Sequence, residues 1–500
     1  MTVAVLGSGP VGQTAALLLA QRGVPVILVD EHERRQPVGS KAICHQRDTL
    51  DVWASLGAGC LAGEGLTWTT ARTFHRDREL FAVRLPDAGS ALPPFVNLSQ
   101  SRVEQVLDEL IARQPLIDVR RGHRITGLTQ PGCVEIACVT RDGPRLIEAD
   151  YAVACTGAHG DVVRRAVGER LDGVSFDDLF LICDIRADLP GWAAERRFYF
   201  DPPWNPGRQV LIHPCPGSQF RIDWQVPDGY DLAAEETGGA LGRRIRAIVG
   251  DRPYEVVWRS VYRFHTRLVR RMRAGRVLLA GDCAHLVAPF GARGLNSGVA
   301  DAENAAWKLA SVLRGEAGDA LLDSYHAERH AAAVENAEVT TATMEFLVPQ
   351  DDRQRRHRAE VLARAADDPA AHAQVDSGRL AEPFWYTDSP LTTPDPSRPF
   401  PGRPPRGTLP PPGPGILLPD VTVPAGRLRG LARQGFLLLT TPGVALPAGL
   451  RAVEIPVGGA LGARPGEVWL VRPDAYVAAV LSEPSTAEVL GALGRASGCR

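Results

Sequence analysis

Residues 3–30 form a strand–glycine–helix–strand pattern, and this pattern constrains the fold more than any other part of the chain. An apolar run at 3–6 is followed by the sequence Gly-Ser-Gly-Pro-Val-Gly, and an apolar helix is predicted from about 13 to 21. A second apolar run at 26–29 ends in Asp30. A Gly-x-Gly-x-x-Gly motif alone is a weak signal, but here strand, helix and acid stand in register with it. The pattern predicts an α/β fold with a Rossmann-like dinucleotide-binding domain.

Each position of this motif has a physical role in holding a dinucleotide. Gly7 makes the tight turn, Gly9 lets the backbone approach a pyrophosphate, and Gly12 permits close packing of the helix on the strand. Asp30 stands where a carboxylate accepts hydrogen bonds from ribose hydroxyls. The predicted cofactor contacts of this region are Gly7, Gly9, Pro10, Val11, Gly12, Asp30 and Glu31.

A second ligand signal lies far from the first, at residues 276–296. A short apolar strand at 277–280 runs into Gly281-Asp282, a loop with Pro289 and two glycines follows, and a helix is predicted to open at Leu295-Asn296. Glycines before a helix let the chain approach a ligand, and the helix N-terminus offers unpaired N–H groups to an electron-rich group. A carboxylate that can hold a polyol chain beside such a helix indicates a flavin. The predicted contacts here are Gly281, Asp282, Pro289, Gly291, Gly294, Leu295 and Asn296.

One cofactor, FAD, accounts for both signals, because a bound NAD would not need the second site. No second strand-plus-glycine unit occurs, so NADPH or NADH would act as a transient reductant without a Rossmann domain of its own.

Length, charge and cysteine content narrow the class of protein. Five hundred residues exceed one ordinary core, and a net charge of −2 gives no argument for nucleic acid or an anionic membrane surface. No apolar run reaches the roughly 18 residues that span a bilayer, and no charged-then-apolar leader opens the chain. The nine cysteines are scattered without a Cys-x-x-Cys pair. We expect a cytoplasmic protein with reduced thiols and no metal site.

The two segments together carry a resemblance to a known family. The run Gly-Ala-Arg-Gly-Leu-Asn at 291–296, followed by Ser-Gly-Val-Ala-Asp-Ala-Glu-Asn-Ala-Ala-Trp-Lys-Leu, resembles the single-component (group A) FAD-dependent aromatic hydroxylases with the para-hydroxybenzoate hydroxylase fold. The chain is most similar to the longer branch of 3-(3-hydroxyphenyl)propionate hydroxylase-like and antibiotic-tailoring monooxygenases. The resemblance covers residues 1–385 by motif order and the C-terminus more faintly.

The resemblance implies roles for further residues. Lys41, Arg47 and Gln100 match positions that contact FAD, and Arg221 matches an arginine near the isoalloxazine ring. By the same resemblance Asp282 would hold the ribityl chain and Pro289 would lie at the oxygen-reacting face. The backbone N–H groups of Leu295 and Asn296 would face the flavin N1–C2 carbonyl edge, where a helix N-terminus stabilises the negative charge of reduced flavin.

The middle motif departs from the family pattern. In the sequence Ala-Cys-Thr-Gly-Ala-His at 154–159, Thr156 replaces the usual Asp before Gly157, and His159 replaces the usual Arg. Thr156 and Gly157 remain predicted FAD contacts, but Thr156 supplies no charge. This departure puts efficient reduction by a nicotinamide in doubt.

The resemblance also implies the domain organisation. We expect an FAD-binding domain at 1–175 and 266–345, a mostly antiparallel β-sheet substrate domain at 176–265, a helical connection at 346–388, a proline-rich linker at 389–420, and a thioredoxin-like α/β domain without a redox Cys-x-x-Cys at 421–500. For the last domain we expect a packing or oligomerisation role, which leaves a homodimer open.

Alternation along 220–225 places Arg221, Asp223 and Gln225 on one face of a predicted strand. That face is either solvated or turned toward the substrate, where Asp223, with His213, would meet a hydroxyl or carbonyl group. A lone histidine such as His213 is also common as an ordinary core residue. We list Arg221, Asp223, His213 and Pro289 as the candidate catalytic residues.

The activity implied is that of an FAD-dependent monooxygenase. It would hydroxylate a phenolic aromatic or polyketide-type substrate through a flavin C4a-hydroperoxide, with NAD(P)H and O2, and without a protein nucleophile. The same fold could instead perform Baeyer–Villiger oxidation, epoxidation or dehydrogenation. A flavoprotein-like binding protein without turnover is a third hypothesis, suggested by Thr156 and His159.

Overall fold

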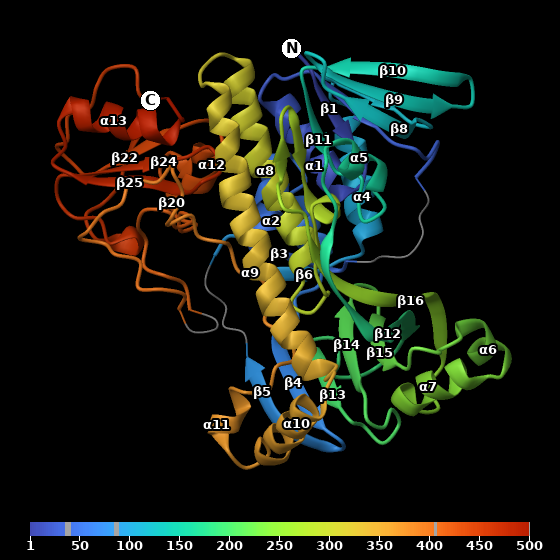
Figure 1. Ribbon diagram of the computed structural model, residues 1–500. Coiled ribbons are helices and arrows are strands. Elements are labelled where there is room, and N and C mark those ends of the chain that lie inside the picture. Colours follow the sequence, from blue (N-terminus) through green and yellow to red (C-terminus); the bar gives the residue numbers. More distant parts are fainter. Residues whose placement is uncertain (36–41, 85–89, 405–407, 500) are drawn as a thin grey trace.

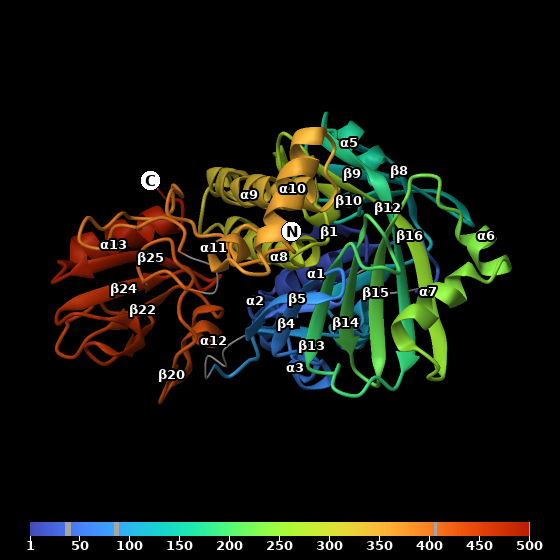
Figure 2. The same ribbon diagram turned by 90° about the horizontal axis from the view of Figure 1, so that it is seen from below.

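The computed structural model describes residues 1–35, 42–84, 90–404 and 408–499 (Figure 1). Lys41, one of the predicted FAD contacts, lies outside the described residues. Two large sheets, one at each end of a long helix, and a smaller C-terminal unit beside them make up the molecule (Figures 1 and 2).

The first sheet contains the predicted dinucleotide unit. Its order is β17-β18-β11-β1-β2-β7, parallel except for the β17–β18 edge pair. These strands are β1 (Val3–Leu6), β2 (Val26–Val29), β7 (Ile117–Arg120), β11 (Tyr151–Ala154), β17 (Arg273–Ala274) and β18 (Val277–Leu279). Helices α1 (Pro10–Gln21), α4 (Gln100–Ile111) and α8 (Arg293–Leu313) pack together against it. β1 is buried at every position, as expected of a parallel strand covered on both faces.

A smaller antiparallel sheet of order β10-β9-β8 shares this core, and short elements complete the domain. They are β8 (Arg124–Thr129), β9 (Val134–Thr140), β10 (Gly143–Ala149), the β3–β6 pair (Cys44–Gln46 and Phe95–Asn97), β19 (His285–Leu286), α2 (Arg47–Ser55), α3 (Cys60–Glu64) and α5 (Asp161–Ala166).

The second sheet has eight strands in the order β19-β16-β12-β15-β14-β13-β4-β5. Its members besides β19 are β4 (Thr70–His75), β5 (Arg78–Arg84), β12 (Asp172–Ala187), β13 (Glu195–Phe200), β14 (Gln209–Cys215), β15 (Gln219–Val226) and β16 (Tyr254–Leu268). All neighbours are antiparallel except β13 and β4. The mostly antiparallel sheet is as predicted, but its assignment to 176–265 alone is wrong. β4 and β5 come from the part of the chain assigned to the FAD-binding domain, because a strand can pair with any neighbour that the tertiary fold brings to its edge.

The two faces of this sheet have different surroundings. Helices α6 (Leu232–Thr237) and α7 (Ala240–Val249) lie on one side, where Leu241, Ile245 and Val249 pack against Ile222 and Trp224. The other face is directed toward the first sheet and packs against the end of α9 (Asp323–Leu347). Helix α9 extends from one sheet to the other (Figure 1). It is followed by α10 (Asp352–Arg364) and α11 (Pro369–His372).

Residues 422–499 form a separate unit with its own core. A four-stranded mixed sheet has the order β23-β22-β24-β25, built from β22 (Leu437–Thr440), β23 (Ala452–Glu454), β24 (Glu467–Val471) and β25 (Val477–Ser482). The β20–β21 hairpin (Thr422–Val423 and Gly426–Arg427), α12 (Leu428–Ala432) and α13 (Thr486–Ala496) complete the unit. The segment before it, which carries twelve prolines in residues 389–420, has no helix or strand in its described part. None of the helices described is both long and apolar enough to cross a membrane.

Candidate active site

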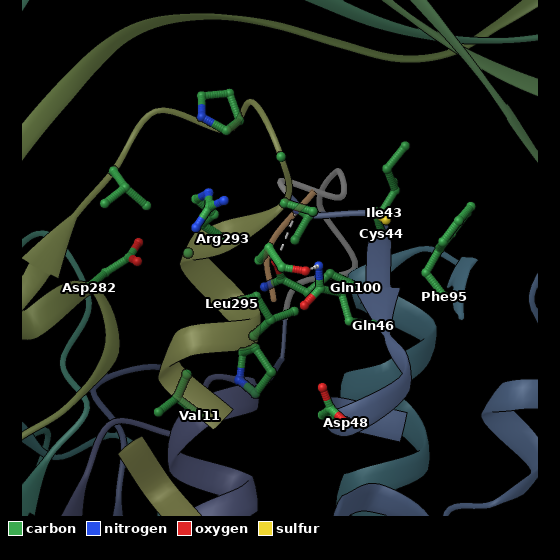
Figure 3. Close-up of a pocket in the computed structure, with 18 of the residues that line it drawn as sticks. Val11, Ile43, Cys44, Gln46, Asp48, Phe95, Gln100, Asp282, Arg293 and Leu295 are labelled. Atoms are coloured by element: carbon green, nitrogen blue, oxygen red, sulfur yellow. Dashed lines mark hydrogen bonds between the residues drawn. The ribbon is translucent and has the colours of Figure 1, made fainter. Parts of the chain in front are cut away.

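A cavity of about 1400 Å³ lies between the two large sheets. Its wall is formed by the loops that follow β1, β2, β11 and β18, by the inner face of the eight-stranded sheet, and by residues 377–385. In Figure 3, Asp282 and Leu295 lie on one side of the cavity, and Ile43, Cys44 and Gln46 around β3 lie on the other. The two predicted ligand signals therefore meet in one space.

The glycine motif after β1 has the geometry of a dinucleotide cradle. Gly7 has φ +104°, and a Cβ there would lie 2.4 Å from the carbonyl oxygen of Cys155. A Cβ at Gly12 would lie 1.9 Å from the carbonyl oxygen of Gly7, so Gly12 serves helix packing and does not line the cavity. Gly9 does line it, and a Cβ there would meet nothing within 4 Å. Open space beside Gly9 is what a pyrophosphate approaching the backbone requires.

Asp30 directly follows β2 and lies at the wall of the same cavity. Its carboxylate accepts hydrogen bonds from Ser8 N (2.8 Å), Ser8 Oγ (2.7 Å) and His32 N (2.9 Å). Burial alone would raise the pKa of Asp30, but these hydrogen bonds outweigh it and lower the pKa. The ionised carboxylate is held in place for further donors such as ribose hydroxyls.

The loop between β18 and α8, residues 280–292, is here called the flavin loop because it carries most of the predicted flavin contacts. Asp282, Pro289, Gly291, Gly294 and Leu295 line the cavity. Helix α8 begins at Arg293, two residues earlier than predicted, so the N–H groups of Arg293, Gly294 and Leu295 have no partner inside the helix.

Two other predicted contacts of this loop, Gly281 and Asn296, act from behind the cavity wall. The Asn296 side chain accepts from Gln46 N (3.0 Å) and donates to Cys44 O (3.0 Å), which fixes the start of α8 to β3. Gly281 N donates to the carboxylate of Asp301 (2.9 Å).

No local sequence pattern marks Asp301, because its partners lie 16–28 residues away on other elements. It is fully buried on α8, with His285 Nε2 at 2.7 Å and Arg329 Nε at 2.7 Å. Burial would raise the pKa of Asp301, but Arg329 and His285 outweigh it and lower the pKa to about 2. Asp301 thus holds the Gly281-Asp282 turn in place without touching the cavity.

Arg47 and Gln100 also reach the cavity wall. Arg47 Nε donates to Leu92 O (3.0 Å), and Gln100 Nε2 donates to Glu104 Oε1 (2.8 Å). Both predicted contacts are therefore brought to the site.

The polar face of the eight-stranded sheet turns toward the cavity, not toward solvent. Arg221 is buried and forms a bidentate pair with Asp184 (2.7 and 2.8 Å), its guanidinium 5.5 Å from the ring centre of Trp258. His213 stands opposite Arg221 in the β14–β15 register, and Asp223 follows two residues along β15. The solvated alternative is excluded for Arg221, Asp223 and His213, all of which line the cavity. Gln225 faces the same way but is tied to Asp178 beyond the cavity wall.

Burial sets the charge of the two titratable groups in this face. It raises the pKa of Asp223 to about 7; Asp184 adds to the shift, and Arg221 and Arg196 oppose it. For His213, burial and the same two arginines hold the pKa well below its usual range. The imidazole is neutral at physiological pH, and Asp223 can exchange a proton there.

The rest of this part of the cavity is aromatic. Phe180 stacks on Phe264 with ring centres 4.4 Å apart, and Phe290 meets both edge-on at 5.6 and 5.9 Å. Trp68 and Phe81 lie on other parts of the wall. No sequence pattern marks these rings, because they come from five separate segments.

Comparison with known proteins identifies the family. The model of the family described as "FAD binding domain" matches residues 1–340. The chain belongs to this FAD-binding family. The residues of the cradle fit the cofactor: Gly9 leaves space for a pyrophosphate, Asp30 is placed for ribose, and the first turn of α8 faces the cavity.

Hydroxylases are among its relatives. A 3-(3-hydroxy-phenyl)propionate/3-hydroxycinnamic acid hydroxylase of Mycobacterium sp. (strain KMS) is 30% identical over 418 residues, which cover 81% of this chain and 70% of that protein. A probable NADH-specific resorcinol 4-hydroxylase of Rhodococcus jostii (strain RHA1) is 29% identical over 371 residues, 70% of this chain and 68% of the other.

Solved structures agree on the fold. The flavin-dependent monooxygenase PieE has a TM-score of 0.85 at 22% identity, and the rebeccamycin biosynthetic enzyme RebC, solved with reduced flavin, has 0.76 at 24%. Each alignment covers 100% of this chain and 99% of the other. The predicted fold class, the cofactor FAD and the class of enzyme, an FAD-dependent monooxygenase, are confirmed.

The departing middle motif of this FAD-binding protein lies at the cavity wall. Thr156 Oγ1 donates to Cys283 Sγ (3.2 Å), and a Cβ at Gly160 would lie 2.0 Å from the same hydroxyl. His159 is exposed. Thr156 is thus packed into the turn below the flavin loop and brings no charge to it.

Residues 376–385, here called the strap, contribute eight side chains or backbone segments to the cavity wall, although a helical connection was predicted for this part of the chain. Arg196 Nη2 donates to Ser377 O (2.6 Å), and Ala381 N donates to Gly291 O (2.8 Å). A Cβ at Gly291 would lie 1.9 Å from Arg379 O, so only glycine allows this approach. The strap connects the eight-stranded sheet to the flavin loop. No sequence motif marks it, because its contacts are mostly through main-chain atoms.

Proposed function

We propose that this protein hydroxylates a phenolic aromatic or polyketide-type substrate with O2, using NADPH or NADH as reductant. One observation carries the proposal: the flavin loop and two titratable side chains, Asp223 and His213, face a single cavity with aromatic walls. When bound, FAD supplies the redox chemistry, taking two electrons from the nicotinamide and passing one oxygen atom of O2 to the substrate.

The protein's own residues bind, orient and deprotonate. With a pKa of about 7, Asp223 accepts the proton of a phenol in its ionised form and returns it afterwards. His213 is neutral and offers a hydrogen bond without adding charge. Arg221 is neutralised by Asp184, so we assign it to positioning of this face.

The walls exclude water from the reacting atoms. Phe180, Phe264 and Phe290 form one continuous aromatic surface, and Pro289 precedes the last of them in the flavin loop. An apolar enclosure strengthens the hydrogen bonds inside it and protects reactive species from hydrolysis. We propose Pro289 as the residue beside the oxygen-reacting face.

Reduction tests the proposal most directly. Holoenzyme is mixed with NADH or NADPH under anaerobic conditions, with and without phenolic compounds, and the flavin absorbance is followed. We expect substrate-stimulated bleaching, followed on admission of ¹⁸O2 by a product carrying one labelled oxygen. Flavin that stays oxidised under every condition would favour a binding protein without turnover. Ester, epoxide or unlabelled dehydrogenated products would favour the other reactions of the fold.

The Thr156→Asp variant tests the departure in the middle motif. Aspartate is of similar size to threonine, and position 156 lies at the cavity wall beside Gly160 and Cys283. If the missing charge slows reduction, the variant reduces faster than wild type at equal FAD content. An unchanged rate would show that Thr156 does not limit the step.

We propose the same domain division as in the sequence analysis, with residues 70–84 added to the substrate domain. The mixed sheet of residues 437–482 with α13 supports a thioredoxin-like unit, and its role in packing or in a homodimer remains our proposal. All nine cysteines are free, which supports a reducing, cytoplasmic location.

A further inference from the structure

The C-terminal unit, residues 422–499, contacts helix α2 of the FAD-binding domain through opposite charges. Two arginines of α12 and its end, Arg429 and Arg433, stand four residues apart, and two carboxylates of α2, Asp48 and Asp51, stand three apart. Both spacings place side chains on the same side of a helix. Arg429 Nη1 lies 2.7 Å from Asp48 Oδ1, and Arg433 Nη1 lies 2.5 Å from Asp51 Oδ2. Arg427, just before α12, adds a third contact to Asp51 at 2.8 Å.

Two buried carboxylates of the FAD-binding domain depend on these arginines. Among the described residues, the hydrogen-bond and ion-pair partners of Asp51 are all arginines of the C-terminal unit. Glu303, on α8, receives a hydrogen bond from Arg433 Nε (2.7 Å). Burial would raise the pKa of Asp51, but the arginines, Arg433 most of all, outweigh it and lower the pKa. Because a buried charge without its partner is strongly unfavourable, the C-terminal unit completes this domain.

Asp48 differs from Asp51 because it faces the FAD-binding cavity. Its side chain is 33% exposed, and it lines the cavity together with Gln46 and Arg47. In Figure 3 it lies on the same side of the cavity as Gln46. Arg429 is its ion-pair partner among the described residues; this arginine is 8% exposed and lines the same cavity. Arg429 Nε also donates to Leu418 O (2.6 Å), in the segment that leads into the C-terminal unit.

The charge of Asp48 matters because FAD is an anion with two phosphate groups. A carboxylate in the wall of its cavity repels the cofactor unless a cation neutralises it, and a protein wall screens this repulsion less than water does. Asp48 follows Arg47, a predicted FAD contact, in the first turn of α2. The neutralising cation comes from a unit more than 370 residues further along the chain.

We propose that Arg429 is a positioning residue of the FAD site, which acts by neutralising Asp48 in the cavity wall. The C-terminal unit is then part of the cofactor site. This inference goes beyond the proposed hydroxylation, because it concerns how FAD is held and not what is oxidised.

The affinity for FAD tests the inference without any turnover. Arg429→Met keeps the length of the side chain and removes its charge, and the partial exposure of Asp48 lets the variant fold. We expect the dissociation constant of FAD, measured by dialysis of the holoenzyme with flavin fluorescence, to rise about tenfold. Arg451→Met is the matched control, since Arg451 is exposed and donates to Leu431 O and Gln434 Oε1 inside the C-terminal unit. Its dissociation constant should equal that of the wild type.

A double variant separates neutralisation from packing. Asp48→Asn in the Arg429→Met background removes the unpaired carboxylate, so it should recover most of the lost affinity. A loss caused only by looser packing of the C-terminal unit would persist, because a substitution on α2 does not restore that packing. An unchanged dissociation constant in Arg429→Met, an equal loss in Arg451→Met, or a loss that persists in the double variant would each overturn the inference. None of these outcomes bears on the hydroxylase proposal, which the reduction experiment decides.

Discussion

Replacing Asp223 by asparagine should lower the activity of the protein. It should also raise the stability of the variant relative to the wild type, and this gain should be larger at pH 8 than at pH 5. The native state keeps the Asp223 proton up to a pKa of about 7, whereas the unfolded chain releases it near 3.8. Between these values the native state binds more protons, so the free energy of unfolding falls as the pH rises through this window and levels off above it. Asparagine does not titrate and removes this loss.

The size of the effect follows from the shift. Each pKa unit corresponds to 1.36 kcal/mol, so from pH 5 to pH 8 the wild type loses about 2–3 kcal/mol through this one group. An unfolding entropy of roughly 2.1 cal/mol/K per residue gives about 1 kcal/mol/K for a chain of this length. The Tm of the variant minus that of the wild type should therefore be about 2–3 °C larger at pH 8 than at pH 5.

The assay is differential scanning calorimetry of both proteins with saturating FAD, since bound ligand raises Tm. Using the difference between proteins cancels the titration of all other groups. In parallel, kcat/KM for the substrate should fall by about 10²–10⁴ if Asp223 moves a proton in the reaction. A Tm difference that does not depend on pH would refute the buried, protonated state of Asp223 in this cavity.

Three further substitutions test separate parts of the structure. Gly12→Ala would place a Cβ 1.9 Å from Gly7 O and should yield protein without FAD. The Cβ of Gly9→Ala would meet nothing within 4 Å, so this variant should fold normally and bind FAD more weakly. FAD affinity is measured by dialysis with flavin fluorescence, and equal affinity in both variants would contradict the cradle geometry. Asp301→Asn removes a buried charge from His285 and Arg329 and should lower the free energy of unfolding by about 3–5 kcal/mol. Urea titration of the holoenzyme measures this change. A loss below about 1 kcal/mol would show that these ion pairs are dispensable. Leu380→Ala enlarges the cavity at the strap and should lower the KM for substrates with larger rings relative to those with small ones. Steady-state kinetics over a series of substrates of increasing size measures this preference. An unchanged size preference would place the limiting wall elsewhere.

Local sequence determined the cofactor site. The segment from Gly7 to Asp30 and the loop from Asp282 to Leu295 are each continuous, and their chemistry depends on glycine conformation and on a helix start that neighbouring residues dictate. Alternation along β15 likewise determined that Arg221 and Asp223 share a face. These features could be predicted because every interaction they need lies within a few residues.

Tertiary structure decided the rest. Whether the face of Asp223 meets solvent or a cavity depended on which side α7 covers, and no periodicity in β15 records that. The pairing of β4 with β13 joins segments more than a hundred residues apart. The strap approaches Gly291 through main-chain atoms, which no side-chain pattern marks. The partners of Asp301 lie 16–28 residues away on other elements, beyond the reach of a local pattern. The sequence by itself determined that the chain holds a flavin. Only the packing of distant segments decided what the flavin faces, because substrate walls are built from side chains whose proximity exists only in the folded protein.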